Sequence, residues 1–263
     1  MPLFVVATPI GNLEEASPRM CRVLSEADLV LCEDSRRART LFAGLELVAP
    51  RLLTCHAHNE AGRLGEIIRQ LEGGATVALI SDAGSPGVSD PGGMVVEAAH
   101  RAGIPVHLVA GPSSVTGALS VAGFRATPFH FLGFPPRKAG ALNSAIIEAS
   151  ALAGPLVFLE SGRRVERLIA ALAEVMPDRE AVICRELTKR YEEVIRGRLV
   201  ELSMEEQRGE VVVVVGPGEA AASVEKETGP DLKGIAASLA ERWGCTKREA
   251  YNTLLALENE RSE

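Results

Sequence analysis

The sequence lacks paired cysteines and long apolar runs. Its five cysteines are widely scattered, and no two form a Cys-x-x-Cys pair. Neither a disulfide framework nor a zinc site is therefore indicated, and a reducing compartment is expected. No apolar run approaches the length of a membrane span. We expect a cytoplasmic protein with no membrane segment and no metal.

Positive charge is also in deficit. The chain has 28 Lys and Arg against 35 Asp and Glu, which gives a formal net charge of -7. Non-specific binding to nucleic acid draws most of its free energy from phosphate neutralisation by Lys and Arg. Broad coating of nucleic acid is thus disfavoured, and any contact with RNA must use local basic patches.

Three common enzyme motifs are missing as well. No Gly-x-Gly-x-x-Gly fingerprint follows the first apolar run, and no Walker-type Gly-Lys-Ser/Thr loop occurs. The usual dinucleotide-binding and nucleotide-triphosphatase interpretations are therefore unsupported. A Gly-x-Ser-x-Gly nucleophile elbow is also absent, which argues against a serine hydrolase.

What the first half does contain is short apolar runs that alternate with amphipathic stretches. The runs cover residues 3–7, 28–32, 76–80 and 105–109. This alternation predicts an α/β fold with a mostly parallel sheet covered by helices. Each run leads into a loop rich in Gly, Pro, Ser or Asp, and open α/β sheets usually bind ligands at such loops.

The pattern breaks near residue 124, where prolines and phenylalanines accumulate. Further on, apolar runs at 156–159, 181–185 and 211–215 and a helical pattern at 165–175 predict a second, smaller α/β domain. Two helical patterns, 232–242 and 247–257, flank Gly244. We expect an N-terminal α/β domain at 1–123, a linker at 124–137, a second α/β domain at 138–218, a tether at 219–230 and a small helical module at 231–263.

The most unusual loop covers residues 81–93, with the sequence SDAGSPGVSDPGG. Its glycines permit close backbone approach, and its aspartates can accept hydrogen bonds from a ligand. Alternatively, the loop is an elaborate turn in which Asp90 caps the next helix. The length of the motif favours a ligand. Residues 111–114 (GPSS) suit a polar cofactor group at a helix start, although serine also serves as an ordinary N-cap.

Charged residues gather at 32–37, 56–60, 160–164 and 185–190, each just after an apolar run or predicted strand. His56, His58 and Glu60 could suggest a metal, but their spacing in an extended segment proves little without a third converging ligand. The arginines are explained either by surface ion pairs or by a local basic patch.

These motifs, taken in order, closely resemble those of the RsmI family, which belongs to the tetrapyrrole-methylase superfamily. Members of the RsmI family are S-adenosylmethionine-dependent ribosomal RNA 2'-O-ribose methyltransferases. The matching segments are 8–13 (TPIGNL), 32–36 (CEDSR), 58–60 (HNE), 81–86 (SDAGSP) with 90–92 (DPG), 111–113 (GPS), 133–134 (GF), 160–161 (ES) and 185–189 (RELTK). The resemblance spans most of residues 3–216.

The resemblance implies a two-domain tetrapyrrole-methylase (class III SAM methyltransferase) fold, a homodimer, and S-adenosyl-L-methionine in the interdomain cleft. The implied acceptor is a cytidine 2'-hydroxyl in the decoding region of 16S rRNA of the small ribosomal subunit. The implied cofactor contacts are Pro9, Ser81, Asp82, Ala83, Gly84, Ser113, Ser114, Phe158, Glu160 and Leu187. The tail resembles the family's helix-turn-helix-like module, with Thr246 capping its second helix and Lys247 and Arg248 facing phosphate.

Methyl transfer to a ribose oxygen needs a base or a charge-stabilising cation near the acceptor. The candidates are Glu33, Asp34, His58 with Glu60 as its orienting partner, and Lys189 as the cation. We expect His58 or Glu60 to be the base. RNA phosphates would be held by Arg36, Arg37, Arg163, Arg164, Lys189 and Arg190.

Two other functions remain open. A tetrapyrrole C-methyltransferase, acting on a corrin or sirohaem precursor, would need a roomy apolar acceptor trough, and the repeated arginines argue against it. A ligand-sensing DNA-binding regulator would use the paired helices of the tail. The net negative charge argues against that function.

Overall fold

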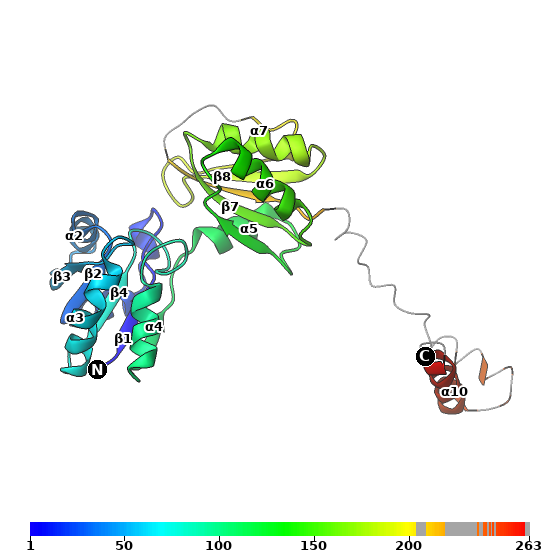
Figure 1. Ribbon diagram of the computed structural model, residues 1–263, viewed down its shortest axis with the longest axis horizontal. Coiled ribbons are helices and arrows are strands. Elements are labelled where there is room, and N and C mark those ends of the chain that lie inside the picture. Colours follow the sequence, from blue (N-terminus) through cyan, green and yellow to red (C-terminus); the bar gives the residue numbers. More distant parts are fainter. Residues whose placement is uncertain are drawn as a thin grey trace. The chain divides into compact units, whose positions relative to one another are not determined.

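The computed structural model describes residues 1–203, 209–218, 236, 239, 240, 242, 244 and 246–260 (Figure 1). The chain divides into two compact units, Met1–Pro217 and Gly218–Glu263. No helix within the described residues is long and apolar enough to cross a membrane.

The first sheet of the larger unit has the strand order β3-β2-β4-β1-β5, and all its pairings are parallel. Strands β2 and β4 are buried at every residue, as expected where helices cover both faces of a parallel sheet. The elements of this half are β1 (Leu3–Val6), the 3-10 helix η1 (Leu13–Glu15), α1 (Pro18–Glu26), β2 (Leu29–Cys32), α2 (Ser35–Gly44), β3 (Arg51–Thr54), α3 (Glu60–Glu72), β4 (Val77–Ile80), α4 (Gly93–Arg101) and β5 (Val106–Val109).

The predicted parallel sheet is confirmed. The four expected runs form β1, β2, β4 and β5, with ends that differ by one residue. Strand β3 was not predicted from the sequence. It lies at the edge of the sheet, is only partly buried and begins with the exposed Arg51. Its sequence therefore contains only a short apolar run.

The second sheet is mixed, with the strand order β6-β7-β10-β8-β9. Only β6 and β7 pair in parallel, whereas β10 is antiparallel to both β7 and β8. The elements of this half are α5 (Ser114–Ala122), β6 (His130–Gly133), α6 (Ala139–Ser150), β7 (Leu156–Ser161), α7 (Val165–Val175), β8 (Glu180–Arg185), β9 (Glu193–Arg198) and β10 (Glu210–Val215). The sequence indicated β7, α7, β8 and β10, but it placed β6 within the expected linker and gave no sign of β9.

Side chains of β10 alternate between two cores, which explains its unbroken run of valines. Val211, Val213 and Val215 pack with α6 and α7, while Val212 and Val214 pack with α5. Helix α5 therefore covers the second sheet, although the sequence-based division at residue 123 assigned it to the first domain. The chain passes from one sheet to the other between β5 and α5.

In the smaller unit, α10 covers Lys247–Glu260. The expected cap is confirmed, because the Glu249 amide donates to the Thr246 hydroxyl oxygen (3.3 Å) and the Thr246 amide donates to the Glu249 carboxylate (2.8 Å). Ala236, Ala240 and Ala250 form a small buried cluster. The expected tether at 219–230 and most of the expected helix at 232–242 lie outside the described residues.

Candidate functional site

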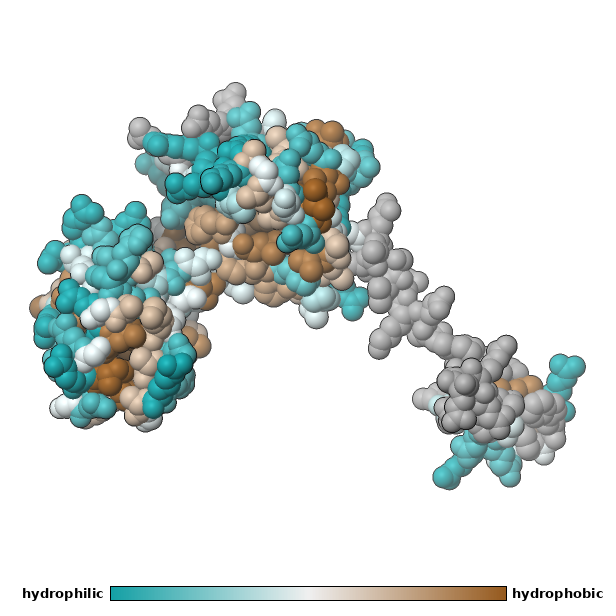
Figure 2. All heavy atoms as spheres, viewed as in Figure 1, coloured by the Kyte–Doolittle hydropathy of each residue, from teal (hydrophilic) through white to brown (hydrophobic). Residues whose placement is uncertain are grey.

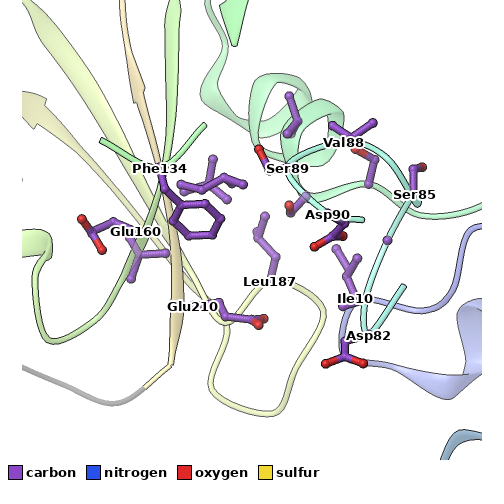
Figure 3. Close-up of a pocket in the computed structure, with 18 of the residues that line it drawn as sticks. Ile10, Asp82, Ser85, Val88, Ser89, Asp90, Phe134, Glu160, Leu187 and Glu210 are labelled. Atoms are coloured by element: carbon purple, nitrogen blue, oxygen red, sulfur yellow. The ribbon is translucent and has the colours of Figure 1, made fainter. Parts of the chain in front are cut away.

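A cavity of about 470 Å³ lies in the larger unit between the loops of the first sheet and the face of the second. Loops that follow β1, β2, β4 and β5 contribute one side of it. Strands β7, β8 and β10, with the loop after β8, contribute the other side (Figure 3). This volume is within the usual range for cofactor and small-molecule sites.

The loop after β4 is fixed to the loop after β1. Thr8 and Gly84 form an isolated antiparallel bridge, with the Thr8 amide donating to the Gly84 carbonyl oxygen at 2.9 Å. The buried Ser81 hydroxyl donates to the same carbonyl oxygen at 3.1 Å. Gly84 has a φ of +80°, a conformation that other residues adopt only with strain. The sharp turn at the cavity wall thus depends on this glycine.

The alternative role considered for Asp90, that of a helix cap, is wrong. The N-cap of α4 is Gly92, and the first amides of the helix are bound by Glu60 from α3. The Glu60 carboxylate accepts hydrogen bonds from Gly92, Met94 and Val95. Asp90 instead lines the cavity.

Carboxylates from three loops share the first-sheet side of the cavity: Glu33, Asp82 and Asp90. Burial, followed by the negative charges of Glu33 and Asp82, raises the pKa of Asp90 to about 6. Burial and Asp82 also raise the pKa of Glu33. The protein therefore holds a partly buried acidic group whose pKa is close to neutrality, the property expected of an acid–base catalyst.

Most residues proposed for cofactor contact meet at this cavity. Those that line it are Asp82, Ala83, Gly84, Ser113, Ser114, Glu160 and Leu187. Pro9, Ser81 and Phe158 do not line it. Phe158 is a core residue, 3% exposed, and the next residue, Leu159, lines the cavity instead. Phe158 faces the core with α6 and α7, whereas Leu159 faces the opposite side of the sheet, with α5.

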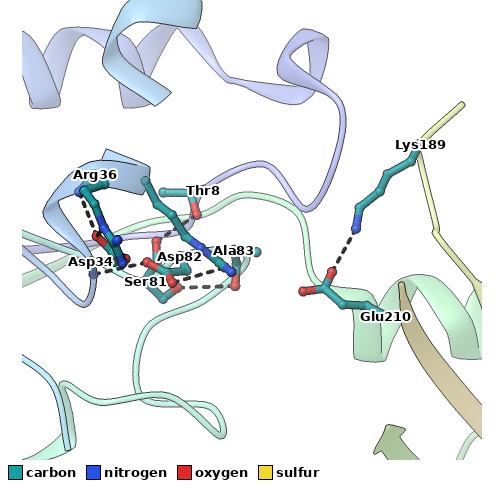
Figure 4. A network of polar contacts seen from close by, with 9 residues as sticks. Thr8, Asp34, Arg36, Ser81, Asp82, Ala83, Lys189 and Glu210 are labelled. Carbon is teal, nitrogen blue, oxygen red and sulfur yellow. Dashed lines mark hydrogen bonds and ion pairs between the residues drawn. The ribbon is translucent and has the colours of Figure 1, made fainter. Parts of the chain in front are cut away.

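Of the proposed catalytic residues, Glu33 and Lys189 line the cavity. The Lys189 ammonium contacts Glu186 at 2.9 Å. It also contacts Glu210 at 3.0 Å (Figure 4). Burial lowers the pKa of Lys189, but hydrogen bonds to these two carboxylates outweigh it and raise the pKa. Lys189 is accordingly a cation at neutral pH.

Asp34 and Glu60 have structural contacts. Asp34 caps α2 and binds Arg36, whose hydrogen bonds lower the Asp34 pKa to about 2. Glu60 is 5% exposed, and its carboxylate accepts a hydrogen bond from a backbone amide of α4. These contacts do not support a role as proton acceptor for either residue.

His58 is exposed and does not line the cavity. Its ring lies edge-on to that of His56, with centroids 6.1 Å apart, and Glu60 is directed to α4 rather than to either ring. Within the described part of the chain, no three His, Cys, Asp or Glu residues are grouped to hold a metal ion. The geometry therefore offers His58 no orienting carboxylate from Glu60.

The arginines proposed for RNA contact differ in their surroundings. Arg36 and Arg37 have side chains that are 86% and 65% exposed, and Arg37 also lines the cavity and contacts Asp82 at 3.2 Å. Arg163 and Arg190 are exposed too, and Arg190 lies over the Tyr191 ring. Arg164 differs, because it is directed to Glu160 at 3.0 Å.

In the smaller unit, Lys247 and Arg248 are exposed at the start of α10. Their contact with phosphate stays a prediction.

Sequence analysis placed Asp90 and Ser85 in the candidate ligand loop without assigning either a cofactor contact, and it did not single out Ile10 or Glu210 as lining residues. Asp90 had a sequence signal, since it belongs to the polar loop after β4, but the pattern was equally compatible with a helix cap. Glu210 had no such signal, because it precedes a run of valines and reads as the polar start of a strand.

Comparison with known proteins identifies the family. The family model for Tetrapyrrole (Corrin/Porphyrin) Methylases matches residues 2–203. A Leptospira biflexa protein named Ribosomal RNA small subunit methyltransferase I is 42% identical over 73% of this chain and 80% of its own length. A Mesorhizobium japonicum protein of the same name is 38% identical over 99% of this chain and 94% of its own.

The fold has a counterpart among solved structures. A crystal structure of uroporphyrin-III C-methyltransferase from Thermus thermophilus, complexed with S-adenosylhomocysteine, is 20% identical, with a TM-score of 0.57 over 81% of this chain and 97% of that one. At this identity the likeness concerns the fold. Together with the family model and the two relatives above, it leads to one conclusion: the chain belongs to the tetrapyrrole (corrin/porphyrin) methylase family, in the branch of the ribosomal RNA small subunit methyltransferase I proteins.

Proposed function

We propose that the protein transfers a methyl group from S-adenosyl-L-methionine to the ribose 2'-hydroxyl of a cytidine in the decoding region of 16S rRNA. The observation that carries the proposal is the 38% identity, over 99% of this chain, with a protein named Ribosomal RNA small subunit methyltransferase I. S-adenosylhomocysteine in the fold neighbour from Thermus thermophilus supports the choice of cofactor.

The cavity suits such a cofactor in size and in chemistry. The backbone at Ser113 and Ser114 opens α5, and amides at a helix start favour a carboxylate group. Leu159 and Leu187 offer apolar contact to a base, while Asp82 can accept hydrogen bonds from hydroxyl or ammonium groups. When bound, the cofactor supplies an electrophilic methyl group. The residues named above would hold and orient it.

Exposed arginines, of which Arg37 lines the cavity, support a polyanionic acceptor. Arg36 and Arg37 are exposed at the start of α2, and Arg163 is exposed after β7. Arginines of this kind can position RNA through its phosphates without reading its sequence. Since the chain as a whole is acidic, RNA would be bound through this limited region.

We propose a homodimer in the cytoplasm as the working form. Large apolar side chains that a monomer would leave in water support it, including Val121 on α5 (53% exposed), Phe129 (40%) and Ile147 on α6 (58%). Figure 2 shows hydrophobic surface over the half that contains α5 and α6. The mass measured by light scattering at several protein concentrations would test this assembly.

A tetrapyrrole C-methyltransferase is the second candidate, because the fold neighbour from Thermus thermophilus carries that name. The charged lining of the first-sheet side, with Glu33, Asp82 and Asp90, is not the roomy apolar trough that such an acceptor would need. A DNA-binding regulator has less support, since the cavity holds a partly buried ionisable group with a pKa typical of a catalyst.

The experiment is methyl transfer from labelled cofactor to small ribosomal subunits from cells that lack this activity. Label should appear on the ribose of one decoding-region cytidine after nuclease digestion and mass spectrometry. Free 16S rRNA, a uroporphyrinogen and duplex DNA serve as parallel acceptors. Label on the tetrapyrrole alone would replace the proposal with the second candidate, and DNA binding without any transfer would favour a regulator.

A further inference from the structure

Phe134 is a large aromatic side chain that the structure leaves partly in water beside the cavity. It follows the last residue of β6, lines the cavity and is 61% exposed. Figure 3 shows its ring directed toward the interior of the cavity. A single exposed apolar residue is ordinary on a protein surface. The meaning of this one therefore depends on how the backbone presents it and on which charges lie beside it.

The backbone on both sides of Phe134 is fixed. The pairing of β6 with β7 shifts register at the end of β6, and such irregularities often re-aim a side chain next to a site. Gly133 has a φ of +61°, and a Cβ there would lie 3.1 Å from the Ser89 hydroxyl oxygen of the loop after β4. Pro135 is buried, and its carbonyl oxygen accepts a hydrogen bond from Arg164 at 3.4 Å. The ring is thus presented by a rigid segment.

Two cations follow Phe134 in the same loop, at Arg137 and Lys138. Both are exposed, and neither forms an ion pair with any residue in the described part of the chain. Even a fully extended loop would keep Lys138 within about 14 Å of Phe134. The exposed Arg163 is the neighbour in sequence of Arg164, which anchors this loop. An aromatic ring and several positive charges are therefore gathered at one edge of the cavity.

The fold itself gains nothing from positive charge at this place. Lys138 is the N-cap of α6, and its side chain makes no capping hydrogen bond. The partial positive charge at a helix N-terminus disfavours a nearby cation. Arg137 and Lys138 therefore oppose the stability of α6 slightly, and a bound anion explains them better than the fold does.

The charges inside the cavity determine which part of an RNA can enter it. Glu33, Asp82 and Asp90 line the first-sheet side and repel a phosphate. A neutral base and its ribose meet no such repulsion, and the flanking phosphates can stay outside with the cations of the loop. Bases of single-stranded RNA stack on exposed aromatic rings, while Lys and Arg hold the backbone.

We propose that the loop 134–138 binds the acceptor strand of RNA, with the base of the target nucleotide stacked on Phe134 and the neighbouring phosphates held by Arg137 and Lys138. This inference rests on the proposed function and identifies the part of the site that binds the acceptor. A second copy of this chain is the competing occupant of an exposed apolar residue. RNA is favoured, because a symmetric contact between two copies would bring the same cations together.

The first test measures affinity for small ribosomal subunits from cells that lack this activity, with S-adenosylhomocysteine present so that no transfer occurs. Phe134→Leu keeps an apolar side chain but removes the stacking face, and it should weaken binding by about 5- to 150-fold. Phe134→Trp restores an aromatic face and should bind about as tightly as wild type. Leu108→Ala is the matched control, at an equally exposed residue of β5 that does not line the cavity, and it should leave affinity unchanged.

The second test concerns the two cations. Arg137→Gln with Lys138→Gln removes two phosphate contacts and should reduce the slope of log affinity against log salt by about 1.4. Arg69→Gln with Arg101→Gln is the control, because it changes the net charge equally at the last turns of α3 and α4, at the opposite edge of the first sheet from the cavity loops. An equal fall in slope in both double variants would overturn the assignment of the cations. Urea unfolding of the first pair should show unchanged or slightly raised stability.

Other contacts of Phe134 have distinct signatures. If Phe134→Leu lost affinity for S-adenosylmethionine in calorimetry as much as it lost affinity for subunits, the ring would contact the cofactor. If light scattering showed that the variant had half the mass of the wild type, the ring would lie between two copies. Either result would overturn the inference.

Single-turnover methyl transfer separates the inference from the proposed function. If Phe134→Leu binds and methylates subunits as wild type does, the inference is wrong and the proposed function stands. If the wild type binds RNA but methylates none, the proposed function fails, and the affinities of Phe134→Leu and Phe134→Trp still decide the inference. If the wild type binds no RNA, both are wrong.

Discussion

The Oε1 atom of Glu60 accepts a hydrogen bond from the Met94 amide at 2.9 Å, so a side chain at the start of α3 completes the first turn of α4. The same oxygen accepts from the amides of Gly92 and Val95, each at 3.1 Å. A negative charge at a helix N-terminus is favoured by the helix dipole. The contact also fixes the end of the loop that contains Asp90.

Glu60→Ala should therefore destabilise the larger unit by about 2–4 kcal/mol, because it leaves amides of α4 without their buried acceptor. Glu60→Gln keeps an oxygen acceptor and should lose less. Urea unfolding measures both, with Glu72→Ala on the exposed face of α3 as the control. Full stability in Glu60→Gln together with lost methyl transfer would restore Glu60 as a candidate base.

Asp90→Asn should stabilise the protein at neutral pH. The Asp90 pKa is higher in the folded state, about 6, than its usual value of 3.8, so the folded state binds more protons between these values. Stability consequently falls as pH rises from about 4 to 6, and the variant avoids this loss. After allowance for solvent screening, the gain at pH 7.5 should be about 1–2 kcal/mol, and it should vanish near pH 3.5.

Unfolding midpoints of Asp90→Asn and wild type at the two pH values would check this. A destabilised variant at pH 7.5 would mean that the Asp90 carboxylate makes a favourable contact in the folded protein. That result would contradict the direction of the pKa shift. Stability and methyl transfer are expected to change in opposite directions, as happens where a site is preorganised at the expense of stability.

The parallel sheet was predictable because its central strands are buried on both faces. β2 and β4 read as continuous apolar runs that end in polar loops. Edge strands carry no such signal. β9 has exposed arginines at alternate positions, and β6 has only four residues and ends at Gly133, so both were missed. The helix α5 was seen, but which sheet it covers depends on contacts between residues far apart in the sequence.

The sequence predicted which loops form the site, but it predicted the roles of individual residues less well. Parallel strands end at one edge, so the loops after β1, β2, β4 and β5 had to lie together. The sequence could not show which carboxylate already accepts hydrogen bonds from the protein backbone. Glu60 and Asp90 look alike as acidic residues in polar loops, and only the three amide contacts of Glu60 separate them.

Gly11→Ala should displace the Lys189 side chain, which lines the cavity. A Cβ at Gly11 would clash with the Lys189 Cγ, so the lysine stem must move and its ion pairs with Glu186 and Glu210 should weaken. Cofactor affinity or turnover should fall. Stability should change little, since the lysine side chain is flexible. Gly65→Ala is the control, because a Cβ there meets no atom within 4 Å and should gain about 0.5–1 kcal/mol of helix stability.

Calorimetry and urea unfolding of both variants separate the two effects. If Gly11→Ala kept full cofactor affinity and full turnover, Lys189 would have no part in the site. If it unfolded at much lower urea than wild type, the glycine would be needed for the fold of the loop instead.

Arg36 and Arg163 should bind RNA phosphates, and their joint substitution by Gln should lower the salt dependence of binding. Each phosphate contact with a single strand contributes about 0.7 to the slope of log affinity against log salt, so the loss of two should reduce the slope by about 1.4. Arg36 is 86% exposed and its pair with Asp34 is open to solvent, so the substitution should leave the fold intact.

The measurement is a binding titration of small ribosomal subunits at several salt concentrations. Arg101→Gln, an exposed arginine paired with Glu97 on α4, is the control, and its slope should equal that of wild type. An unchanged slope in the double variant would place the RNA elsewhere. If Arg101→Gln alone lowered the slope by about half as much as the double variant, the attraction would come from the net charge of the protein and not from Arg36 and Arg163.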